Sequence, residues 1–168
     1  FGFTVPFVAH FNPMAAVEAV AKSKGDLALV SATASRQPWW LELEAEGTPK
    51  IIARLPFVER ADHPAALPVF VVSRVADSAM VTEVEMWSVR VSGWNAETAR
   101  AVASLAEIAA VPDSAFDGAA LLVSVQGAGN LDKITSALVA AGATVRSTAL
   151  VGSHATRYTV TTNDAARR

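Results

Sequence analysis

The sequence contains no cysteine among its 168 residues, which excludes disulfide bonds, thiolate metal sites and thiol nucleophiles. Histidine is also scarce, and His10, His63 and His154 lie too far apart for the spacing of metal ligands. The sequence therefore predicts neither a metal site nor another cofactor.

Charged residues of both signs are few. They make up 18% of the chain, the formal net charge is -2 and no basic cluster occurs, which argues against binding to a nucleic-acid backbone. No apolar run reaches the roughly 20 residues of a transmembrane helix, and the N-terminus lacks the pattern of a signal peptide. We therefore expect a soluble cytoplasmic protein with no membrane or nucleic-acid partner, which binds a small molecule or another protein chain.

The start of the chain predicts an α/β arrangement. Residues 1–9 predict a buried strand, and a helix is predicted to begin at Asn12 and Pro13 and to end at Gly25. Residues 27–31 predict a second strand, which would complete a βαβ unit of a parallel sheet. Because the chain opens on an apolar stretch without methionine, we expect it to be part of a longer polypeptide.

Two apolar strands are predicted in the middle of the chain. They cover residues 51–58 and 67–75 and flank a turn at residues 60–64. The prolines in this region favour strand ends and bends, where polar side chains meet solvent or a ligand. Residues 41–46 predict a short helix just before the first of these strands.

The second half predicts a βαββαβ order. Asn95 and Asn130 are predicted N-caps of its two helices, and Gly142 is predicted to end the second one. The strands are predicted at residues 84–92, 108–111, 119–126 and 143–151, with an edge strand at 156–161. This order is the ferredoxin-like arrangement. We therefore expect one domain over residues 1–78, a second over 79–162, and a flexible tail at 163–168.

Two segments resemble the prephenate dehydratases. Residues 24–32 contain a Gly25-Asp26 pair before a strand of small residues, and residues 62–74 run from Asp62-His63-Pro64 into an apolar strand. The second half is similar in layout to the regulatory ACT domain of that family, and residues 150–154 resemble the end of that domain. The resemblance implies an incomplete periplasmic-binding-protein-like lobe followed by an ACT-like domain.

The chain as a whole resembles the part that follows the helical chorismate mutase domain in some bacterial bifunctional polypeptides. The resemblance implies an upstream chorismate mutase domain and a homodimer. Pro68 and Val69 stand where the dehydratases have a catalytic threonine and an arginine, and only Phe70 agrees with that motif. Proline and valine offer neither a proton nor a charge for dehydration. The phenylalanine-binding motifs of the family's ACT domain are also missing.

We therefore expect a binding, regulatory or dimerisation module without catalytic residues. One alternative is a working prephenate dehydratase that uses Thr4 and Arg54. A second alternative is an unrelated small-ligand sensor whose pocket is lined by Trp39, Trp40 and the hydroxyl groups of residues 31–36.

Arg54 and Arg60 are the strongest candidates for ligand binding, because a guanidinium binds a carboxylate through two hydrogen bonds. Their expected ligand is a small dicarboxylate or an aromatic amino acid. The alternative is that each arginine forms an ion pair with Glu59 or Asp62.

Further polar residues are candidates for the same ligand. His63 has a side chain that titrates near neutral pH, although a histidine in a turn is usually solvated. Thr4 aligns loosely with a substrate-binding region of the dehydratases, although threonine is common in strands. An anion cradle at a helix start is predicted for Ser31, Thr33, Ser35 and Arg36, with ordinary capping as the alternative.

Three other features have ordinary structural interpretations. Trp39 and Trp40 are adjacent, and burying both fully is harder than burying one. The glycines before Asn130 are better explained by a helix-entry turn than by a phosphate loop. His154, Arg157 and Tyr158 are predicted to lie on the surface of an edge strand, with a dimer contact as the alternative.

Overall fold

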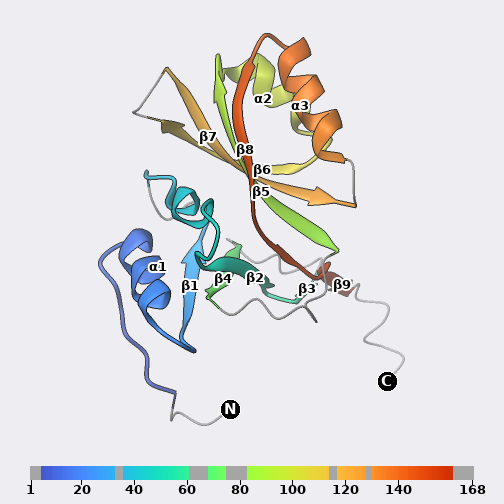
Figure 1. Cartoon of the computed structure of the whole chain (residues 1–168). Helices are drawn as coiled ribbons and strands as arrows, with labels where there is room; N and C mark the ends of the chain where they lie inside the picture. The colour runs from blue at the N-terminus through green and yellow to red at the C-terminus, as the bar shows by residue number, and fades with distance from the viewer. Residues whose placement is uncertain are drawn as a thin grey trace.

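The computed structural model describes residues 5–32, 36–60, 68–74, 83–113, 117–127 and 130–160. Figure 1 shows its helices and strands. The helices are α1 (Pro13–Lys22), the 3-10 helix η1 (Trp39–Leu43), α2 (Ala96–Val102) and α3 (Asn130–Ala140). The strands are β1 (Leu27–Ser31), β2 (Lys50–Leu55), β3 (Val58–Arg60), β4 (Val69–Ser73), β5 (Val84–Ser92), β6 (Glu107–Asp113), β7 (Gly118–Gln126), β8 (Thr144–His154) and β9 (Tyr158–Val160).

A mixed, mostly antiparallel sheet of seven strands runs through the molecule in the order β1-β4-β2-β8-β5-β7-β6. The fold is therefore α/β. Its neighbouring strands are antiparallel except for β2 and β8, which meet in parallel at Ile51 and Gly152. Strands β3 and β9 form a separate parallel pair. That pairing corrects the expectation that the chain after residue 155 adds an edge strand to the main sheet.

The second half has the predicted βαββαβ order, and its strands lie in the order β8-β5-β7-β6. Asn95 caps α2 as predicted, because its side chain accepts hydrogen bonds from the backbone N–H groups of Glu97 and Thr98. Helix α2 is shorter than expected. The N–H groups of Leu105 and Ala106 both donate to the carbonyl of Val102, which ends the helix in a tight turn.

The two faces of this part of the sheet have different covers. Helices α2 and α3 cover one face, where Val102, Ile134 and Leu138 pack against residues of β5 and β7 (Figure 1). The other face packs against the first half of the chain, where Trp39 and Trp40 are both fully buried. From the sequence we expected that burying both tryptophans fully would be harder than burying one of them. It occurs because η1 places both side chains in a core cluster that includes residues of all seven strands of the sheet.

The first part of the chain differs from the prediction. Residues 5–9 are not a buried strand, and Phe7 is 83% exposed. Helix α1 does begin at the predicted cap, since Asn12 accepts a hydrogen bond from the N–H of Ala15. Strand β1 pairs antiparallel with β4, with Leu29 opposite Val71. The expected parallel βαβ unit is therefore wrong, because β1 takes its partner from a strand much later in the sequence.

The middle strands are antiparallel neighbours, as expected of a strand pair joined by a turn. β2 and β4 pair from Lys50 opposite Ser73 to Leu55 opposite Val69. Arg60, the first residue of the predicted turn, belongs to β3, whereas residues 61–64 and the expected domain boundary near residue 78 lie outside the described part of the chain. No helix among the described residues is long and apolar enough to cross a membrane.

Candidate functional site

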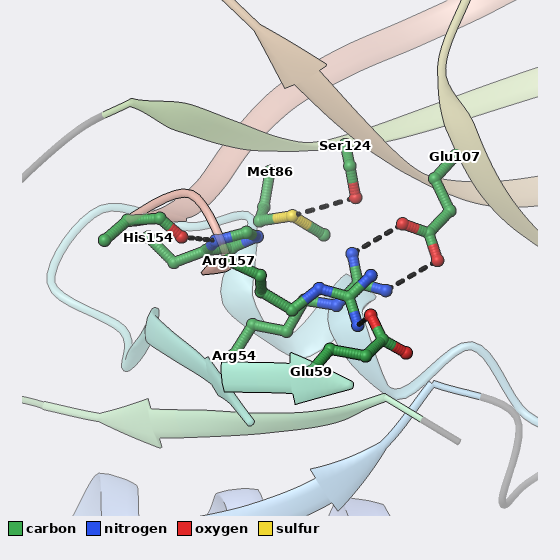
Figure 2. A network of polar contacts seen from close by, with 8 residues as sticks. Arg54, Glu59, Met86, Glu107, Ser124, His154 and Arg157 are labelled. Atoms are coloured by element: carbon green, nitrogen blue, oxygen red, sulfur yellow. Dashed lines mark hydrogen bonds and ion pairs between the residues drawn. The ribbon is translucent and has the colours of Figure 1, made fainter. Parts of the chain in front are cut away.

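A polar pocket of about 680 Å³ lies where the β3–β9 pair meets the start of β6 and the end of β8. Five charged or titratable residues line it and come from three separate parts of the sequence: Arg54, Glu59, Glu107, His154 and Arg157 (Figure 2). Uncharged polar side chains surround them, including Ser104, Ser124, Gln126, Asn130, Thr156 and Thr159. The pocket therefore offers hydrogen-bonding groups from both halves of the chain.

Arg54 forms the innermost ion pair. Its Nη1 and Nη2 atoms donate to the Glu107 carboxylate at 2.5 Å and 2.6 Å, while its side chain is only 6% exposed. A bulge in β2 between Ile51 and Ala53 breaks the strand alternation, so that Ile51 and Arg54 are both buried. The guanidinium also lies 5.8 Å from the centre of the Phe70 ring. The sequence had offered Glu59 or Asp62 as the partner, and the observed partner is Glu107.

The ion pair determines the charge state of Glu107. Hydrogen bonding from Arg54 lowers the pKa of this carboxyl, although burial acts in the opposite direction. Glu107 therefore stays ionised at neutral pH. A carboxylate held in this way accepts hydrogen bonds and is poorly suited to act as a general acid.

A second ion pair closes the pocket on the side of the two-stranded sheet. The Nη1 atom of Arg157 lies 2.8 Å from the Glu59 carboxylate, and the two side chains are 25% and 19% exposed. Glu59 lies in β3 and Arg157 directly precedes β9, so the ion pair joins the two strands of that sheet. A guanidinium has five N–H donors, so Arg157 can bind a further acceptor without losing Glu59.

His154 is buried beside these arginines, which corrects its predicted place on the surface. Its Nδ1 atom lies 2.7 Å from the carbonyl oxygen of Ala155, and a carbonyl only accepts, so Nδ1 carries the proton. Burial lowers the pKa of His154, and the two arginines lower it further. The ring is therefore neutral at pH 7, with Nε2 as an acceptor that has no hydrogen-bond partner among the described residues.

Of the predicted ligand-binding residues whose side chains are described, only Arg54 lines the pocket. Ser31 and Arg36 do not line it. The side chain of Arg60 lies outside the described part, as do four whole residues: Thr4, Thr33, Ser35 and His63. Sequence reasoning did not find the partners of Arg54 and Arg157, because no local pattern relates Glu107 or Glu59 to them.

No family model, curated protein or solved structure matches the chain. The function is therefore argued from the geometry of the pocket and from the arrangement of the strands.

Three other groups of residues considered in the sequence do not line the pocket. Pro68 and Val69 do not line it, and Val69 is instead paired with Ser31 and Leu55 in the sheet. Trp39 and Trp40 have no exposed surface, so a sensor pocket lined by them is wrong. Tyr158 is exposed, as predicted.

Proposed function

We propose that the chain is a non-catalytic module that binds a small carboxylate-bearing molecule in the pocket around Arg54 and Arg157. The bidentate contact between Arg54 and Glu107 carries this proposal, because it joins a strand of each half at the pocket and fixes the guanidinium in place. No acid poised to give up a proton accompanies it, since the pKa of Glu107 is lowered and His154 is neutral. These groups suit binding and orientation of a ligand.

The charge balance of the pocket favours an amino acid over a dicarboxylate. The positive charges of Arg54 and Arg157 are already balanced by Glu107 and Glu59. A dicarboxylate would bring two further negative charges close to both glutamates, and each like-charge contact at about 4 Å costs about 4 kcal/mol near a protein surface. An amino acid adds no net charge, because its carboxylate can approach Arg157 while its ammonium approaches Glu107.

In this proposal the chain belongs to a cytoplasmic chorismate mutase polypeptide of aromatic amino-acid biosynthesis, and its second half acts as an ACT-like regulatory domain. The βαββαβ order and the two helices on one face of the sheet support the second part of this assignment. The dehydratase-like lobe has weaker support, because β1 pairs antiparallel and Val69 does not line the pocket. A dehydratase that depends on Arg54 is disfavoured, since Glu107 already occupies that guanidinium and leaves Arg157 to receive the carboxylate of a ligand.

Calorimetric titration of the purified chain with phenylalanine, tyrosine and prephenate tests the proposal, combined with an assay for phenylpyruvate. We expect an amino acid to bind and no phenylpyruvate to form. The variant Arg157→Ala should weaken binding at least tenfold, whereas Arg36→Ala should not, because Arg36 is exposed and outside the pocket. Phenylpyruvate formation would support the dehydratase instead, and silence with all three compounds would reject the binding function.

A further inference from the structure

Exposed apolar side chains gather near the start of the described chain. Phe7 is 83% exposed and Phe11 is 99% exposed, and both lie in the segment before α1. We call residues 5–11 the arm. Leu27 and Leu29 of β1 are also more than half exposed. Large apolar side chains cost free energy when they face water in a contiguous group, so such a group marks an interaction surface.

Strand β1 is one edge of the seven-stranded sheet. Among the described residues it pairs with β4 alone and no strand lies along its other side, so this edge can accept a further strand. Its sequence, Leu-Ala-Leu-Val-Ser, contains no charged residue and no proline. The opposite edge strand, β6, is protected in the usual way, because it carries Pro112 and has acidic residues at both ends. The two edges therefore differ in their readiness to accept another strand.

The arm has the properties of a strand that lacks a partner. It leads into α1 as a coil (Figure 1), and none of its described residues belongs to the sheet. Apolar residues dominate it, and the chain contains no charged residue before Glu18. Pro6 cannot donate a hydrogen bond, which is tolerated in a strand that pairs on one side only.

We propose that two copies of the chain form a two-fold dimer in which the arm of each copy lies along the β1 edge of the other. Such an exchange is reciprocal, because each copy provides one arm and receives one. Both β1 edges are then occupied, so the assembly ends at two copies. Identical surfaces would repel each other if they were charged, and neither the arm nor β1 carries a charge. The four phenylalanines of two arms would bury roughly 600–1,000 Å², a large share of the roughly 1,200–2,000 Å² of a stable interface.

Sedimentation equilibrium of the whole 168-residue chain over a range of concentrations tests this proposal. We expect a monomer–dimer equilibrium. The arm variant Phe7→Ser/Phe11→Ser and the edge variant Leu29→Lys should each raise the dissociation constant at least tenfold. Val139→Ser, which alters an exposed apolar residue of α3, should leave it unchanged and is the matched control. Circular dichroism checks that each variant remains folded, as expected for exposed positions.

Mixing the two weakened variants identifies the geometry. A mixed dimer keeps one of its two contacts. In that contact, the unaltered arm of the Leu29→Lys chain lies along the unaltered β1 edge of the chain that carries the arm variant. The mixture should therefore associate more tightly than either variant alone. A wild-type chain that stays monomeric, a dimer that neither variant weakens, or a mixture without any gain would each overturn the proposal. The test does not depend on the pocket or its ligand.

Discussion

Gly152 of β8 lies directly against the backbone of Ile51 in β2. A β-carbon on Gly152 would lie 2.1 Å from the Ile51 carbonyl oxygen and 2.5 Å from its nitrogen, and the φ of Gly152 is +148°. Only glycine fits this close approach between the two strands that join the halves of the sheet. The position is therefore a structural requirement of the fold.

The variant Gly152→Ala should lose about 3 kcal/mol or more of unfolding free energy, because backbone atoms must move to admit the methyl group. Urea unfolding followed by circular dichroism measures this loss. Gly25→Ala is the matched control, since no atom lies within 4 Å of a β-carbon built there. That variant should change stability by less than about 1 kcal/mol. Equal effects of the two substitutions would contradict the close approach.

Removing the two partners of the Arg54–Glu107 ion pair should have unequal effects. The side chain of Arg54 is 6% exposed and that of Glu107 is 58% exposed. Glu107→Ala leaves a buried charge without its partner and should cost about 3 kcal/mol. Arg54→Met leaves an exposed carboxylate and an apolar side chain against Phe70, and should cost about 1 kcal/mol or less. Urea unfolding of both variants measures the two losses. A larger loss for Arg54→Met than for Glu107→Ala would contradict the prediction.

Stability should fall in acid partly because of Glu107. Arg54 lowers the pKa of this carboxyl below its ordinary value of 4.5, so the unfolded chain takes up a proton at a higher pH than the folded protein does. The contribution of the ionised Glu107 to the free energy of unfolding is complete above pH 4.5. It is lost as the pH falls from 4.5 through the lowered pKa of the folded protein. The variant Arg54→Met removes the main cause of the shift. Its unfolding free energy should therefore decline less steeply below pH 4.5 than that of the wild type.

His154 should show a specific tautomer and a low titration midpoint. Nitrogen-15 correlation spectra of the rings should show the proton on Nδ1, and a proton on Nε2 would contradict the contact with Ala155. The midpoint should lie below the ordinary value of 6.5, mainly because the ring is buried. The neutral His154 ring contributes fully to the free energy of unfolding above pH 6.5. This contribution is lost as the pH falls from 6.5 through the lowered pKa.

The elements that the sequence predicted well are those with local signals. Strand β5 has the predicted bounds, and Asn95 caps α2, because strand composition and capping depend on neighbouring residues. The partner of β1 was not predictable in this way. An apolar run indicates a strand, but the choice of its neighbour depends on β4, which lies about forty residues later. The same limit explains residues 5–9, which have strand-like composition and no strand partner in the described chain.

The site was predictable only at Arg54. An arginine within an apolar strand is a conspicuous candidate for ion pairing, but its partner Glu107 lies 53 residues away. Glu107 opens a strand in the other half, where a glutamate is usually solvated. His154 and Arg157 were predicted on the surface because β9 was expected at the edge of the main sheet. His154 is buried at the end of β8, where it pairs with Val84 and lies against Phe70, and Arg157 is partly covered by its ion pair with Glu59, and no local pattern indicates either contact.

The shared core has a consequence for synthesis on the ribosome. Trp39 and Trp40 pack in one cluster with Met86, Leu122 and Val151. At about 5–20 residues per second, residue 151 emerges roughly 5–20 s after the tryptophans. During that delay the nascent chain displays two large indole rings whose cover has not yet been made, so early chaperone contact is expected at η1.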